Sequence, residues 1–64
     1  MKTVVVYLTD KNRTKMFKNY VSELFIDSAV KELQQHINSA KKNPFQYRFL
    51  DIDTIEIKTE IINN

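Results

Sequence analysis

The 64-residue chain contains no glycine and no cysteine, and it has a single proline, Pro44, and a single histidine, His36. Phosphate-binding loops, dinucleotide-binding fingerprints, nucleophile elbows and calcium-binding loops need glycine where the backbone turns sharply or approaches a ligand. Disulfides, thiolate zinc sites and thiol nucleophiles need cysteine, and one histidine cannot form a multi-histidine metal site. We therefore expect a protein that is not an enzyme and that binds neither a cofactor nor a metal.

The length of the chain predicts one compact domain covering residues 1–64. At this size only about 60% of the unfolded chain's surface is buried on folding, so stability is modest and a homodimer would raise it. Hydrophobic residues make up 42% of the chain, which is enough for a core. The apolar run at residues 4–8 is too short for a signal peptide or a membrane span, which predicts a cytoplasmic protein without a membrane partner.

The first strand and the turn after it are the clearest features of the amino-terminal half. Residues 2–9 are rich in β-branched side chains on both faces, which predicts a strand buried on both sides at the centre of a sheet. Residues 10–13 have the composition of a turn, and Asn12 is the best candidate for the left-handed conformation that glycine usually adopts. The chain is expected to reverse direction there.

Residues 14–26 fit two different elements. Their apolar side chains recur at helical spacing, whereas their position after a turn and their aromatic and β-branched content favour a strand paired with the first. We interpret the segment as a strand that is interrupted near Lys18 and Asn19, with a helix as the alternative. A helix here would change the fold to two helices against a three-stranded sheet.

An amphipathic helix of about four turns follows. Its buried face is marked by apolar residues at helical spacing, namely Val30, Leu33, Ile37 and Ala40. Asp27 or Ser28 is placed to cap the first amides, and the lysines at 41–42 lie at the negative end of the helix dipole. Asn43 is predicted to end the helix in the left-handed conformation, and Pro44 prevents its continuation.

The carboxy-terminal third is expected to form a β-hairpin. Phe45, Tyr47 and Phe49 alternate with polar residues, and after a turn at 51–54 the alternation resumes at Ile55 and Ile57. The predicted fold is therefore α+β, with β-β-α-β-β order and one amphipathic helix packed on one face of a small antiparallel sheet. The aromatic residues of the strand would lie under the helix, while Arg48 would point away from it.

Basic residues are the first candidates for a binding site. The net charge is only +2, but cations gather around the first turn and around the end of the helix. If they share one surface, they would bind the phosphates of a nucleic acid, and the neighbouring aromatic side chains would stack on its bases. The simpler interpretation is a solvated surface. The candidates are Lys11, Arg13, Lys15, Lys18, Lys41, Lys42 and Arg48.

Titratable side chains offer weaker signals. His36 lies four residues after Glu32, which suggests a loose surface pair rather than a general base, because no nucleophile is evident beside it. Asp51 and Asp53 have neither the glycine nor the later glutamate of a calcium loop, so we expect them to stabilise a turn. These residues support the expectation that no catalytic or metal site is present.

The last strand provides the leading hypothesis for function. If it lies at the edge of the sheet, it offers unpaired backbone groups to another chain, either a partner protein or a second copy in a homodimer. We therefore interpret the chain as a non-enzymatic interaction protein that binds or occludes another protein through a sheet edge or a helix face. Its many Lys, Asn and Ile residues suggest an AT-rich phage or plasmid gene. The candidate edge residues are Ile55, Ile57, Lys58 and Ile61.

Overall fold

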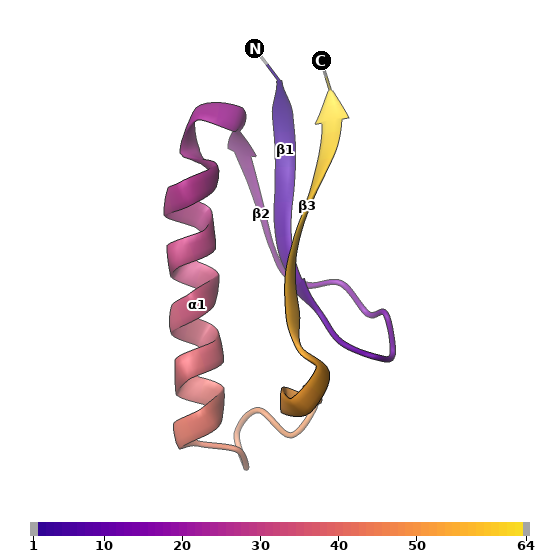
Figure 1. The fold of residues 1–64 in the computed structure, drawn as a ribbon, viewed down its shortest axis with the longest axis vertical. Helices are drawn as coiled ribbons and strands as arrows, with labels where there is room; N and C mark the ends of the chain where they lie inside the picture. Colours follow the sequence, from indigo (N-terminus) through magenta and orange to yellow (C-terminus); the bar gives the residue numbers. More distant parts are fainter. Residues whose placement is uncertain (1, 64) are drawn as a thin grey trace.

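The computed structural model describes residues 2–63, without the side chain of Asn63, and contains three strands and one long helix (Figure 1). The sheet is antiparallel, with the strand order β2-β1-β3. The predicted α+β class, with one helix packed against an antiparallel sheet, is confirmed. The elements are β1 (Thr3–Thr9), β2 (Met16–Ser22), η1 (Glu23–Phe25), α1 (Ile26–Lys42), η2 (Ile52–Thr54) and β3 (Glu56–Asn63).

Strand β1 occupies the centre of the sheet and is buried on both faces. One face carries Val4, Val6 and Leu8, which pack against α1. Burial of each such side chain contributes about 1.5–3 kcal/mol. Because neighbouring side chains of a strand point to opposite faces, Val5 and Tyr7 lie on the other face, and they are also buried. The helix residues of this core are Ala29, Leu33 and Ile37.

Residues 16–22 form a strand, as interpreted from the sequence, and its irregularity lies at Phe17 and Lys18, close to the interruption predicted near Lys18 and Asn19. Val6 pairs with Asn19 and Leu8 pairs with Met16, so β2 contains a bulge at Phe17, whose φ is 54°. The left-handed residue of the preceding turn is Arg13, with a φ of 60°, and not Asn12 as predicted. The Asn12 amide instead donates to Asp10 Oδ1 at 2.9 Å, which fixes Asn12 inside the turn.

The predicted helix is present and ends at Asn43 as expected, but the expected N-cap and the expected left-handed conformation of Asn43 are wrong. The single turn η1 runs directly into α1, so the N-cap is Phe25, which makes no side-chain capping bond. Neither Asp27 nor Ser28 is needed as a cap, because η1 continues the helical backbone ahead of them. At the other end Asn43 has a φ of −128° and is not left-handed; its amide donates to the Ser39 carbonyl oxygen at 2.8 Å.

The predicted strand over Phe45, Tyr47 and Phe49 does not form, so the element order is β-β-α-β and not β-β-α-β-β. Residues 44–49 make successive turns, in which the amides of Gln46 and Leu50 donate to the third residue before them. The 17-residue helix, about 25 Å long, returns the chain to the end of the sheet where β3 begins (Figure 1). An additional strand would reverse β3 and make it parallel to β1.

A buried carboxylate joins the first turn to the segment before β3. Asp10 is only 6% exposed, and its Oδ2 accepts the Asp51 amide at 3.1 Å while Oδ1 holds Asn12. The Lys11 amide donates to Thr54 Oγ1 at 3.0 Å, and the Lys11 ammonium lies 3.3 Å from Asp51 Oδ2. These bonds clamp two segments that are about forty positions apart in the sequence.

The clamp gives a direct prediction for stability. Replacing Asp10 with alanine leaves the amides of Asn12 and Asp51 without their carboxylate acceptor, so we expect urea denaturation to show a loss of about 2 kcal/mol. Asp53→Ala is the matched control, because the Asp53 side chain is exposed and makes no hydrogen bond within residues 2–63. A loss for Asp10→Ala no larger than that of the control would show that the clamp does not stabilise the fold.

Candidate functional site

Both flanking strands are edges of the sheet, but their edges differ. In β2 the bulge at Phe17 twists the strand and disturbs its outer row of backbone groups, which hinders addition of another strand. In β3 the register with β1 is continuous from Glu56 to Ile61, and it shifts only beyond Ile61. Within residues 2–63, β3 pairs with β1 alone. The regular outer edge of β3 is therefore the candidate strand-binding site.

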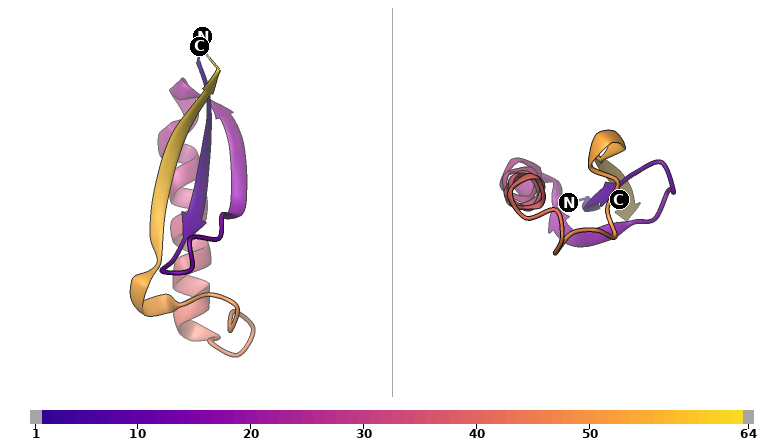
Figure 2. Two further views of the ribbon diagram at one scale, coloured as in Figure 1. Left: turned by 90° about the vertical axis from the view of Figure 1, so that its right-hand side faces the viewer. Right: turned by 90° about the horizontal axis from the view of Figure 1, so that it is seen from below.

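The side chains of β3 divide into an apolar and a charged set. Ile57, Thr59 and Ile61 pair with the β1 residues that face α1, so they point to the helix side of the sheet. The helix runs along β1 and leaves β3 partly uncovered (Figure 2). Ile57 is half-buried, whereas Thr59 is exposed and Ile61 is 60% exposed. The helix side of β3 thus offers apolar surface next to its open edge.

The opposite, open face of the sheet carries a small polar network. The Tyr7 hydroxyl donates to Glu60 Oε1 at 2.9 Å, and the Lys15 ammonium lies 3.0 Å from Glu60 Oε2 and 5.3 Å from the centre of the Tyr7 ring. The hydrogen bond from Lys15, followed by that from Tyr7, lowers the pKa of Glu60. The hydrogen bond between the Tyr7 hydroxyl and Glu60 raises the pKa of Tyr7. Lys15 and Glu60 therefore cover Tyr7 on a face that no helix covers.

A pocket of about 620 Å³ lies on this open face, beside the first turn. It brings together three of the predicted basic residues and adds one cation from β3. Asp10 and Glu56 also line it, and Lys11, Lys15 and Lys58 each have a carboxylate within 4 Å. Arg13 has no such partner in the part of the chain that the structure describes. The four cations are Lys11, Arg13, Lys15 and Lys58.

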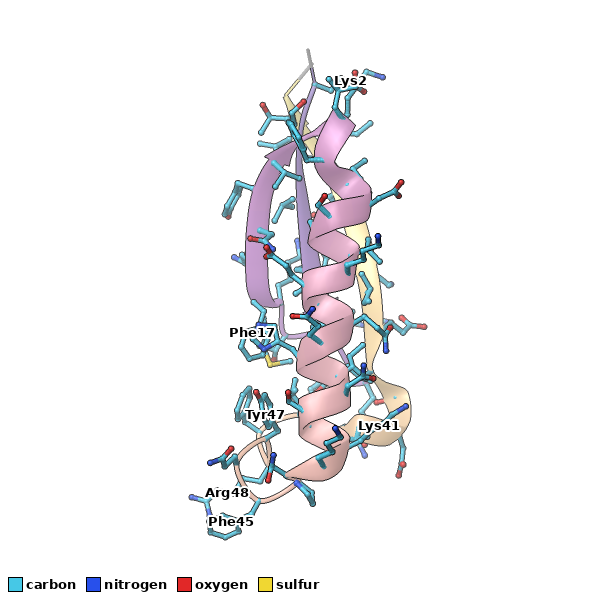
Figure 3. The ribbon with its side chains drawn as sticks, turned by 90° about the vertical axis from the view of Figure 1, so that its left-hand side faces the viewer. Lys2, Phe17, Lys41, Phe45, Tyr47 and Arg48 are labelled. Carbon is cyan, nitrogen blue, oxygen red and sulfur yellow. The ribbon has the colours of Figure 1, made fainter. Side chains whose placement is uncertain are left out.

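The remaining predicted basic residues do not join this pocket. Lys18 is exposed on β2 and lies outside the pocket lining, and Lys42 is exposed at the end of α1. Lys41 lies on α1, which packs on the other face of the sheet (Figure 3). Arg48 lies in the turns after the helix, with its guanidinium 5.1 Å from the centre of the Phe45 ring. The seven predicted residues thus occupy different parts of the surface.

His36 contributes to a second, shallower pocket of about 400 Å³ along α1. Glu32 and Ser39 line the same pocket, but no hydrogen bond joins either of them to His36 among the described residues. Glu32 Oε2 instead accepts from Asn19 Nδ2 at 3.0 Å, and the imidazole stacks on Phe17 at 4.3 Å. The expected pair of Glu32 and His36 is therefore not formed.

An aromatic cluster that was not predicted from the sequence surrounds Phe17. Besides His36, the Phe17 ring contacts Phe49 at 6.1 Å and Tyr47 at 6.5 Å between ring centres. Phe17 and Tyr47 lie on the same side of α1 (Figure 3). These contacts hold the backbone bulge of β2 in place. The sequence did not predict these contacts, because aromatic residues that alternate with polar ones, as Tyr47 and Phe49 do, are typical of a strand.

Within residues 2–63, the acidic residues form no metal site and no helix is suited to span a membrane. No group of three His, Cys, Asp or Glu side chains in this part of the chain is arranged to hold a metal ion. The Asp51 carboxylate accepts hydrogen bonds within its own turn, from the Asp53 amide and the Thr54 hydroxyl. The bond from Thr54, followed by that from Lys11, lowers the pKa of the Asp51 carboxyl group. Over the same residues no helix has both the length and the apolar character to cross a bilayer.

Comparisons with protein-family models, with curated proteins and with solved structures find no match to this chain. The candidate surfaces are therefore interpreted from their own geometry and chemistry.

The network around Glu60 predicts how stability depends on pH. Its pKa is lower in the folded state than its ordinary value of 4.5, so its contribution is present above pH 4.5 and is lost as the pH falls through the folded-state pKa. Lys15→Met should move the NMR-measured pKa of Glu60 upward and reduce this loss of stability on acidification. The control Lys18→Met changes a lysine that makes no ion pair with Glu60. Equal pKa values of Glu60 in the two variants would contradict the assignment.

Proposed function

We propose that the chain is a non-enzymatic protein-interaction module that binds an extended segment of another polypeptide at the outer edge of β3. The observation that carries the proposal is a regular, unpaired edge from Glu56 to Ile61 beside the exposed side chain of Ile61. An added strand would satisfy the free backbone groups of β3, and its side chains would cover apolar surface on the helix side. From composition we also propose a cytoplasmic protein encoded by a phage or plasmid.

Several exposed apolar side chains support a binding role. Leu24 and Phe25 of η1 are 70% and 58% exposed, and they lie at the same end of the molecule as Ile61 and Ile62 of β3 (Figure 1). A monomer of this size gains stability when such side chains are covered, because folding alone buries only about 60% of the surface that the unfolded chain exposes. The β3 edge combines this apolar surface with backbone N–H and C=O groups, whose hydrogen bonds would align a partner strand along β3.

The proposal predicts that peptides can be selected for the β3 edge. Peptides recovered from a random display library should bind in an extended conformation and protect β3 amides, but not β2 amides, from hydrogen exchange. Ile61→Lys should weaken this binding about tenfold, because it places a charge on the apolar side of the added strand. The matched control is Phe45→Lys, which alters a residue that is 79% exposed and lies in the turns after α1, outside β3.

Recovered peptides that bind both variants equally would place binding elsewhere on the protein. Failure to recover any peptide that protects β3 amides would count against strand addition by a foreign polypeptide.

The basic pocket supports nucleic-acid binding as a second candidate function. It gathers Lys11, Arg13 and Lys15 with Lys58, and Arg13 is not engaged in an ion pair within the described chain. A phosphate group could replace the carboxylate partners of these lysines. The ion pairs and the position of Lys41 on the opposite face weaken this candidate, because they divide and neutralise the positive charge.

Fluorescence anisotropy with labelled single- and double-stranded oligonucleotides tests the second candidate. If the pocket binds phosphates, affinity should fall steeply with salt, and Arg13→Glu should reduce the slope of log K against log salt by about one phosphate contact or more. Lys41→Glu is the control on the other face and should have a much smaller effect. Absence of binding at low salt would leave only the protein-interaction proposal.

A further inference from the structure

We infer that the polypeptide that occupies the β3 edge is a second copy of this chain, paired antiparallel with its own β3 so that Thr59 faces Thr59. The inference rests on the proposed function, since it uses the same edge, but it names the partner and the register. Two antiparallel copies of one strand are related by a two-fold axis perpendicular to the sheet. The question is whether the side chains of β3 are compatible with such an axis.

The Thr59 register makes the charges of β3 complementary. In an antiparallel homodimer centred on residue 59, Lys58 lies directly opposite Glu60 of the second copy, and the same pair occurs again across the axis. Lys58 is available for this contact, because its only ion pair in the described chain is a 3.7 Å approach to Glu56. Glu60 can also accept another bond, since each carboxylate oxygen has more than one acceptor position.

The same register matches apolar residues on the helix side. Ile57 lies opposite Ile61 of the second copy, and this pair also occurs twice. Ile61 is 60% exposed on this side of β3, and Ile57 is half-buried against the core. Each copy thereby covers the exposed isoleucine of the other with a side chain that already belongs to a core. Glu56 lies opposite Ile62, which introduces no repulsion between like charges.

Neighbouring registers are poorer. Centring the pair on Lys58 places Glu56 opposite Glu60 and Lys58 opposite Lys58, which are like charges at directly opposed positions. Centring it on Ile57 leaves Ile61 and Ile62 beyond the paired region. Centring it on Glu60 opposes Glu60 to itself. The Thr59 register alone among these pairs residues 56–62 with residues 62–56 and contains no like-charge opposition.

The resulting assembly is a continuous six-stranded sheet with the order β2-β1-β3-β3-β1-β2. A two-fold axis perpendicular to the sheet places both helices on the same face. The outermost strands are then the two β2 strands, whose bulges at Phe17 disfavour addition of further strands. The association therefore closes at two copies and does not continue into a fibre.

Single-cysteine variants test the register, and the natural chain has no cysteine that would interfere. In the Thr59 register the two residues 59 are directly opposed, with Cα atoms about 4.5–5.5 Å apart, which is within the range of a disulfide. Residues 58 of the two copies are offset by two positions along the strand, so their Cα atoms are about 8 Å apart and beyond that range. Residues 60 are offset by the same amount.

We therefore expect Thr59→Cys to form a disulfide-linked dimer in a glutathione buffer at least about tenfold faster than Lys58→Cys or Glu60→Cys alone. An equal mixture of Lys58→Cys and Glu60→Cys should cross-link preferentially between the two variants. All three positions are exposed, so differences in accessibility do not explain this pattern. Equal rates for all variants, or a preference for Lys58→Cys with itself, would overturn the register.

Charge reversal tests the same pairs without a covalent bond. By sedimentation equilibrium, Lys58→Glu should weaken the dimer about tenfold, because it opposes two pairs of like charges. Glu60→Lys should weaken it also, and mixing these two variants should restore a heterodimer. Circular dichroism of each variant checks that the monomer is folded, which matters most for Glu60→Lys because Glu60 binds Tyr7 and Lys15.

A wild-type chain that stays monomeric at its highest soluble concentration overturns the inference. The proposed function would survive that result if selected peptides still protect the β3 amides. A dimer that is unaffected by charge reversal at Lys58 also overturns it, since the interface would then lie elsewhere.

Discussion

The burial of β1 on both faces is the constraint on which the rest of this structure depends. The single helix can cover one face, where Val4, Val6 and Leu8 contact α1. The other face has no covering element among the described residues, yet Val5 and Tyr7 are buried there. Side chains of the adjacent segments supply the cover, as Lys15 and Glu60 do over Tyr7. Polar contacts on the open face thus complete a core that α1 covers on one side only.

Because β1 is central, β2 and β3 are both edge strands, and they differ in the regularity of their backbones. The bulge in β2 requires a left-handed backbone at Phe17, which is unfavourable for a residue with a Cβ atom. Contacts of the Phe17 ring with His36, Tyr47 and Phe49 compensate for this cost. The turns after the helix therefore have a structural role, because they carry two of these rings to the bulge. The edge of β3 has no comparable distortion before Ile61.

Charges on the open face are distributed so that most cations have an acidic neighbour. Lys11, Lys15 and Lys58 approach Asp51, Glu60 and Glu56 respectively. Exposed pairs of this kind contribute little to stability, but they reduce the positive field around the first turn. On β3 the alternation of acidic and basic residues has another effect, because it restricts the registers in which two such strands can meet. The unpaired edge of β3 thus favours some pairing registers over others.

The sequence by itself determined the elements whose side chains repeat at a clear period. These are the doubly buried strand β1, the helix with Leu33 and Ile37 on its inner face, and the last strand with its isoleucines. The Asp51 turn also followed from local chemistry. Residues 14–26 could be read as strand or helix; pairing with β1 decided in favour of a strand for Met16–Ser22, whereas residues 23–26 form η1 and the start of α1. Local preference was nearly balanced there, so a non-local contact decided the outcome.

The candidate site depended more strongly on tertiary structure. The sequence named Ile55, Ile57, Lys58 and Ile61, but Ile55 lies before the start of β3. The sequence also could not show that β3 is an edge strand or that α1 leaves Ile61 exposed. It also suggested a strand at Phe45 and Phe49, where the end of α1 beside the start of β3 leaves room only for turns. Tyr7 and Glu60 are 53 positions apart, and no local pattern connects them. Periodicity records which side of an element is apolar, whereas strand order, edges and distant polar contacts follow from how the elements meet.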